Sequence, residues 1–379
     1  MAPKCVLSFV EKCCIWLLTA CGVLSFRYNA STNRFEKSAL HYMGCVVGTV
    51  FYIVFGPWIY WGSVNTVLHP STMLNYYMIV LQFIFMYNII LISRIKSLSN
   101  GERLRQLLNG LLAIREQVLQ GLPIVSCDQD LPQKLLLKLI VFDFGMMVLC
   151  AFFFRTFVEH SESFLYSLLG FCNLMQVSSM NVAINLLLFV LYNGINIYLQ
   201  INARCNDLVY GSKAPMEIVQ LYLMHTDTSL VVQGIVEVVS IPILLLCIWY
   251  FFIIVFSVFY TYTSLVQDVR AGSGDALLNV INPIAFFISE AGQVYFMVSG
   301  AAMFTNRARQ IMPCLNLYTG RITDVPGDQA IELLTIEYLS RDYAIRIKGL
   351  FTIDNTILFA IVASTTSYMI ILVQYYLQE

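Results

Sequence analysis

The chain has 379 residues, of which 58% are hydrophobic and only 12% are charged, and its formal net charge is −1. An ordinary soluble domain has about 25% charged residues, so a soluble protein with this composition would lack the polar surface to cover its core. The near-neutral balance also excludes the concentrated basic face that nucleic-acid binding requires. The composition therefore indicates an integral membrane protein whose partners include lipid and no nucleic acid.

Seven stretches of the chain are long and apolar enough to cross a bilayer, which takes about 20 residues each. Ahead of them, the stretch 5–26 is interrupted by Glu11 and Lys12, so we expect an interfacial or partly buried helix there. The expected spans are, in chain order, 39–61, 72–95, 137–158, 163–192, 238–263, 280–303 and 352–376.

Two of these spans carry a carboxylate, Asp143 in the third and Glu290 in the sixth. A charge at membrane depth is costly, so both side chains should face protein or water rather than lipid. The uncharged stretch 163–203 would allow two short crossings or one long helix. No proline interrupts it, and its glycines lie too near the ends for a hairpin of two full spans, so we expect one helix that continues past the membrane.

The basic residues fall on alternate sides of the expected spans. Only Arg155 and Arg270 lie on one side, and the other 20 of the 22 lie in the segments 1–38, 94–138, 196–236 and 304–348. Lys and Arg are retained in the cytoplasm, which predicts a cytoplasmic N-terminus and an extracellular C-terminus. G-protein-coupled receptors have the reverse topology. Asn282-Pro283 only superficially resembles their N-P-x-x-Y motif and falls in the sixth span near its outer end, and we interpret Pro283 as a proline that opens a helix.

The last span ends in an uncharged segment with amide and hydroxyl groups at helical spacing. Ser367, Ile370/Ile371 and Gln374 follow i, i+3/i+4 spacing near its outer end. One interpretation is an interhelical hydrogen bond. The other is a pore lining, in which an apolar ring gates by dewetting and an amide ring lets hydrated ions pass.

The same segment resembles the signature of the insect gustatory receptors, which is T-Y, five apolar residues, then Q-F. Here it reads Ser367-Tyr368, Met369–Val373 and Gln374-Tyr375, with Ser for Thr and Tyr for Phe. The segments 349–354 and 22–28 are also similar to parts of that family.

This resemblance implies an all-α, polytopic receptor of seven transmembrane helices, with its N-terminus inside and its C-terminus outside. Such receptors are ligand-gated, non-selective cation channels in the plasma membrane of sensory neurons. They are homo- or heterotetramers of gustatory receptor subunits whose seventh helices line the pore. By position, Ile371, Gln374 and Tyr375 would form the gate.

The resemblance also implies a division of the chain into three parts. Residues 1–38 would be a cytoplasmic or interfacial segment, and 349–379 the pore helix with a short extracellular C-terminus. Residues 39–348 would hold the first six spans, with cytoplasmic anchor helices at approximately 96–137, 193–236 and 304–348.

A ligand pocket is expected in the outer halves of the second to sixth spans, from polar and aromatic side chains. Any one of these could equally be a packing residue, and only Glu290 and Gln293 clearly share one helical face. The candidates are Gln82, Tyr166, Gln176, Tyr260, Asn282, Glu290 and Gln293. The high aromatic content favours a bitter or other non-volatile tastant, with a sugar as the alternative.

Two other classes of membrane protein, a secondary transporter and an enzyme, are the alternatives to a receptor channel. A secondary transporter would show internal repeats with broken helices, and saturable uptake without current would identify it. An enzyme would be expected to carry a motif such as H-E-x-x-H or G-x-S-x-G, and the sequence contains neither. The four histidines are too scattered for a metal site, so we expect no enzyme activity, metal or cofactor.

Overall fold

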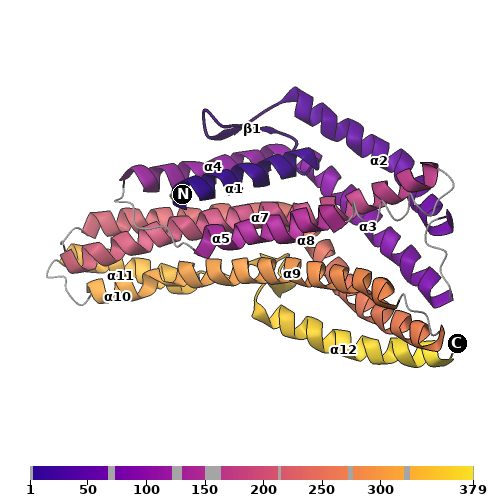
Figure 1. Cartoon of the computed structure of the whole chain (residues 1–379). Helices are drawn as coiled ribbons and strands as arrows, with labels where there is room; N and C mark the ends of the chain where they lie inside the picture. Colours follow the sequence, from indigo (N-terminus) through magenta and orange to yellow (C-terminus); the bar gives the residue numbers. More distant parts are fainter. Residues whose placement is uncertain are drawn as a thin grey trace.

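The computed structural model describes residues 3–66, 73–121, 130–149, 164–211, 215–271, 276–319 and 325–378. This part of the chain is helical apart from two short hairpins, which confirms the expected all-α class. Three long helices pack on one another through the middle of the molecule (Figure 1). They are α7 (Phe164–Gly211), α8 (Pro215–Ala271) and α9 (Ala276–Arg309).

The central helix α7 explains why an uncharged stretch can be so long. In its most apolar 18-residue stretch, 83% of the residues are buried inside the protein, so most side chains there contact other helices rather than lipid. It has 48 residues and α8 has 57, which at 1.5 Å per residue is about 70 Å and 85 Å. A bilayer core is about 30 Å thick, so both helices extend well beyond it.

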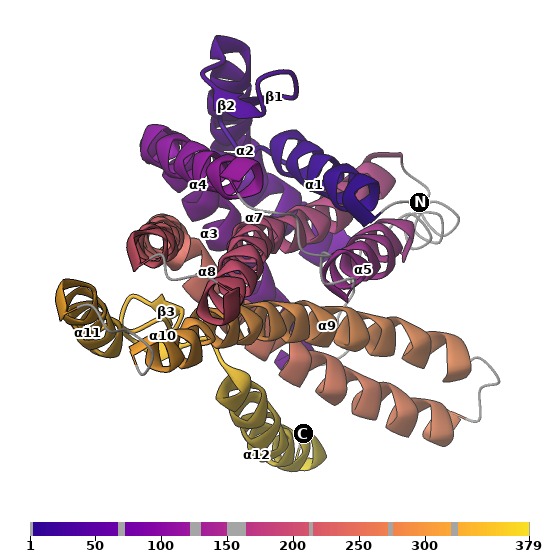
Figure 2. The ribbon, with the colours of Figure 1, turned by 90° about the vertical axis from the view of Figure 1, so that its left-hand side faces the viewer.

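The remaining helices surround this central trio. Figure 2 shows α7 near the middle of the assembly and α12 standing apart from the other helices. In Figure 1, α2 and α12 diverge from the bundle on opposite sides. The surrounding helices are α1 (Pro3–Ala20), α2 (Ala39–Thr66), α3 (Met73–Ser99), α4 (Gly101–Gly121), α5 (Asp130–Leu137), α10 (Ile311–Thr319), α11 (Val325–Ser340) and α12 (Asn355–Gln378).

Six helices among the described residues are long and apolar enough to cross a membrane. They coincide with six of the seven expected spans, and the stretch 163–203 is one continuous helix as predicted. The expected third span, 137–158, is described only as far as residue 149. Its remaining part, including Arg155, lies outside the described residues.

Two hairpins fix the approach to the first and last of these helices. Strands β1 (Arg27–Asn29) and β2 (Arg34–Glu36) pair antiparallel ahead of α2. The second hairpin, β3 (Arg346–Ile347) with β4 (Phe351–Thr352), leads into α12. Three residues, 348–350, connect its strands. Lys348 and Gly349 have φ of 50° and 70°, and the N–H of Leu350 donates to the carbonyl oxygen of Ile347 at 2.9 Å.

The prediction that Pro283 opens a helix is wrong. Helix α9 begins at Ala276, so Pro283 lies inside it, as Pro57 does in α2 and Pro242 in α8. A proline inside a soluble helix breaks the backbone hydrogen-bond ladder. Membrane helices tolerate the residue because neighbouring helices and side chains satisfy the freed carbonyl groups.

A π-helical segment, η1 (Lys138–Phe144), continues α5 and packs against α9. Its Phe142 ring meets Phe296 edge-on, with 5.4 Å between ring centroids, and lies over the backbone of Gly292. A Cβ atom at position 292 would be 1.9 Å from Cε1 of Phe142, so only glycine leaves room for the ring.

Replacing Gly292 with alanine should therefore destabilise the protein. Overpacking of this kind costs about 1–3 kcal/mol, because the Phe142 ring or the helix must shift. The matched control is Gly110→Ala in α4, where the nearest atom is 3.9 Å away and alanine is the better helix former. Thermal unfolding of the purified proteins should show a lower midpoint for Gly292→Ala and no loss for Gly110→Ala. Equal midpoints would mean that the ring position is not fixed.

Candidate functional site

The predicted gate residues lie on a helix that the rest of the chain barely covers. No residue in the most apolar 18-residue stretch of α12 is buried, and the helix contains no charged residue over Asn355–Gln378. Ile371 and Tyr375 are each 58% exposed, and Gln374 is exposed beside them. The hydroxyl of Ser367 donates a hydrogen bond within the helix, to the carbonyl oxygen of Ala363 at 3.1 Å.

Helix α12 rests on α8 through aromatic rings. Tyr368 meets Phe251 with 5.8 Å between centroids, and Tyr376 meets Phe259 at 6.1 Å. These contacts set the rotation of α12 about its axis, so that the stripe through Phe359, Ile370 and Gln374 points away from the subunit. Among the motif residues, Tyr368 contacts α8 although its side chain is 52% exposed, and Gln374 is exposed on the outward stripe.

A buried ion pair forms the polar centre of the bundle. Nζ of Lys138 lies 2.7 and 2.8 Å from the two carboxylate oxygens of Asp143, and both side chains are 1% exposed or less. Asn185 of α7 completes the arrangement, because it accepts from Lys138 and donates to Asp143 at 2.7 Å. A buried charge pair is tolerated only when its remaining hydrogen-bonding capacity is satisfied in this way.

Glu290 and Gln293 of α9 join the same centre. Gln293 donates to Asp143 at 3.2 Å, and Glu290 accepts from the amide of Asn181 at 3.2 Å. The hydroxyl of Tyr250 donates to the other end of Asn181 at 3.0 Å. Both expected carboxylates, Asp143 and Glu290, therefore face protein. One oxygen of Glu290 and that of Gln293 have no hydrogen-bond partner within the described part of the chain.

The other expected pocket residues are not brought to this centre. Tyr260 stacks along its own helix on Phe256, and Gln82 is half-buried on α3. Gln176 accepts a hydrogen bond from Tyr60. No hydrogen bond among the described residues links any of these three to Glu290. The side chains of Tyr166 and Asn282 lie outside what the structure describes.

Gln176 belongs instead to an aromatic group between α2, α3 and α7, which the sequence analysis did not identify. The hydroxyls of Tyr52 and Tyr60 are 2.5 Å apart. The Tyr52 ring stacks on Tyr87 at 5.3 Å, and the Tyr60 ring lies 5.0 Å from Phe83. Gly56 allows the Tyr87 ring to approach, since a Cβ there would lie 2.8 Å from it.

Breaking the buried ion pair should be far more damaging than breaking an exposed one. Lys138→Met leaves Asp143 charged, buried and unpaired, which costs about 3–5 kcal/mol. Adding Asp143→Asn to that variant should recover much of the loss. The control is Arg103→Ala, which removes a surface pair with Glu237 whose side chains are 61% and 59% exposed, and should cost about 1 kcal/mol or less. Thermal unfolding in detergent measures all three, and a Lys138→Met variant as stable as the control would contradict the assignment.

Comparison with known proteins places this architecture. A family model described as 7tm Chemosensory receptor matches residues 11–379. Among solved structures, the chain is similar to the insect olfactory receptor OR5 from Machilis hrabei in complex with eugenol. That match has a TM-score of 0.62 and 12% identity, covers 98% of this chain and 99% of that one, and shows the fold alone. No curated protein matches the chain. Because the family model spans nearly the whole sequence, this multi-pass membrane protein belongs to the 7tm chemosensory receptor family.

Proposed function

We propose that the chain is one subunit of a ligand-gated, non-selective cation channel that responds to non-volatile tastants. Four subunits would surround a pore lined by α12 in the plasma membrane of a sensory neuron. The observation that carries this proposal is the uncovered face of α12, an uncharged helix whose apolar stripe ends in Gln374. Such a face needs lipid or other copies of the chain against it, and an amide is unfavourable against lipid.

The gate would consist of Ile371, Gln374 and Tyr375, all exposed in the single subunit. An isoleucine ring closes a pore by excluding water, and a ring of amides offers hydrated cations neutral oxygen ligands. Rotation or outward displacement of α12 on its Tyr368 and Tyr376 contacts would widen the apolar ring. Opening would then need no break in the helix.

The distribution of basic residues supports a cytoplasmic N-terminus, with 20 of the 22 on that side. The parts of α7 and α8 that exceed the bilayer would then stand in the cytoplasm. Together with the segments 96–137, 193–236 and 304–348 they would form the anchor that holds four subunits in register. The gate at the end of α12 would lie on the extracellular side.

A bitter or other aromatic tastant fits the outer halves of the spans better than a sugar. The rings of Tyr52, Tyr60, Phe83 and Tyr87 gather there with few free polar groups, and Tyr52 and Tyr60 are each 6% exposed in this structure. Eugenol, the ligand in the similar olfactory receptor structure, is itself a small aromatic molecule. In this chain, Glu290 and Gln293 could instead serve a sugar, but Asn181 and Asp143 already engage them.

Expression of the chain in a heterologous cell, alone and with other gustatory receptor subunits, tests this function. The cells are tested with bitter alkaloids, aromatic compounds and sugars. Alkaloids or aromatic compounds should evoke cation currents, and sugars should evoke none. Responses to sugars alone would overturn the choice of ligand class. Saturable uptake of a compound without any current would overturn the channel itself.

Replacing Gln374 with leucine should change permeation rather than assembly. The variant removes the amide ring and extends the apolar constriction, so single-channel conductance should fall severalfold. The matched control is Gln117→Leu, the same substitution at an exposed position of α4, which should leave conductance unchanged. Single-channel recording measures both, and an unaltered conductance in Gln374→Leu would place the pore elsewhere.

A further inference from the structure

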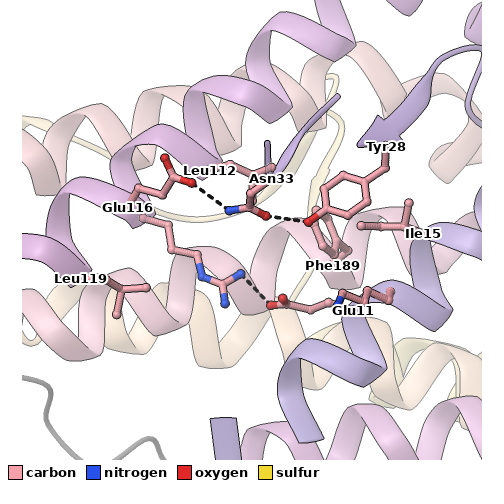
Figure 3. Close-up of a pocket in the computed structure, with 10 residues that line it drawn as sticks. Glu11, Ile15, Tyr28, Asn33, Leu112, Glu116, Leu119 and Phe189 are labelled. Carbon is pink, nitrogen blue, oxygen red and sulfur yellow. Dashed lines mark hydrogen bonds and ion pairs between the residues drawn. The ribbon is translucent and has the colours of Figure 1, made fainter. Parts of the chain in front are cut away.

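A cavity of about 200 Å³ lies where α1, the first hairpin, α4 and α7 meet, far from the end of α12 (Figure 1, Figure 3). Part of its wall is apolar. Ile15 and Leu112 are 6% and 4% exposed, and Phe189 contributes an aromatic side chain from α7. The volume is sufficient for a small organic molecule, and neither the pore nor the Lys138–Asp143 centre contributes to the lining.

One of the two carboxylates in this cavity is already neutralised. Nη1 of Arg115 lies 2.8 Å from Glu11 and 2.7 Å from the side-chain oxygen of Asn193, so it is fixed between α1 and α7. Burial raises the pKa of Glu11, and Arg115 opposes that rise. This pair joins the helices and leaves no net charge.

The second carboxylate, Glu116, is held in place without a cation. It accepts from the amide of Asn33 at 3.0 Å, and no lysine, arginine or histidine of the described chain forms an ion pair with it. Asn33 is itself fixed, because it accepts from the Tyr28 hydroxyl at 2.6 Å and has a left-handed backbone, φ 53°. Figure 3 shows this chain of contacts running from Tyr28 through Asn33 to Glu116.

The lining holds two acidic and two basic side chains, and within the described residues Glu116 is its one carboxylate without an ion pair. Burial raises the pKa of Tyr28, and Glu11 and Glu116 raise it further while Arg115 lowers it. Lys12 also contributes to the lining, but its side chain is exposed at the rim, where water screens its charge. A fixed carboxylate beside aromatic and aliphatic walls is the arrangement that binds an amphiphilic cation.

We propose that this cavity is a binding site for a small protonated amine with an apolar body. The ammonium group donates to the free oxygen of Glu116, and the body lies against Ile15, Leu112 and Phe189. The ligand enters from the side of the membrane that carries the N-terminus. Because it contacts α1, the hairpin and α4 together, its binding strengthens their packing on α7.

The test uses the full chain, purified and reconstituted in lipid nanodiscs, with 2-phenylethylamine and 2-phenylethanol as probes. The two share one aromatic body, and only the amine is charged at neutral pH. Isothermal titration calorimetry should give about tenfold or greater preference for the amine, since a hydrogen bond between two charged groups is stronger than one to a neutral hydroxyl.

Three variants locate the site. Glu116→Gln should abolish the preference for the amine, whereas Glu102→Gln, the same change on the same helix outside the cavity, should preserve it. Leu119→Trp fills the cavity and should remove binding of both probes. The proposal is overturned if wild-type protein binds both probes equally, or if Glu116→Gln or Leu119→Trp binds the amine like wild type. These measurements involve no current, so their outcome is independent of the proposed channel function.

Discussion

The requirement to satisfy charge inside an apolar bundle determines how the centre of this protein is built. Lys138 and Asp143 lie at full burial, where an unpaired charge would cost several kcal/mol. The two charges neutralise each other, and Asn185 from α7 and Gln293 from α9 satisfy the remaining hydrogen-bonding capacity of Asp143, so three elements distant in sequence must meet at one point. A second buried group, in which Asn181 donates to Glu290 and accepts from Tyr250, joins α7 and α9 to α8. These hydrogen bonds fix how far the long helices are shifted along one another, in addition to which of their faces pack together.

The sequence was sufficient to predict elements whose signal is local. Apolar length identified six of the seven expected spans, and the distribution of Lys and Arg favoured the single continuous helix α7. The exposed end of α12 was identified by its uncharged composition and by its resemblance to a family motif. Asp143 and Glu290 were correctly expected to face protein, because membrane depth alone makes that demand.

What the sequence could not predict depends on geometry that departs from the regular α-helix. Five residues of an α-helix turn the chain so that Lys138 and Asp143 would point about 140° apart. The π-helical segment η1 changes that register and brings them together, and no residue type announces it. Pro283 was misplaced for a related reason, since membrane helices continue through a proline. The aromatic group around Tyr60 joins residues more than 100 positions apart and has no local signal.

The continuity of α8 gives the molecule a mechanical element. Pro242 divides its 57 residues into two arms of about 40 Å each, and a tilt of roughly 5° in one arm displaces the end of that arm by about 4 Å. The arm that follows Pro242 supports α12 through Phe251 and Phe259. The arm that precedes Pro242 packs on α4, which borders the cavity near Glu116. Pro242 lies between the two arms, at the position where such a lever can bend. A movement of one arm would therefore reach the other only as far as the helix stays straight at Pro242, so this proline links the contacts of α12 to the packing around the cavity.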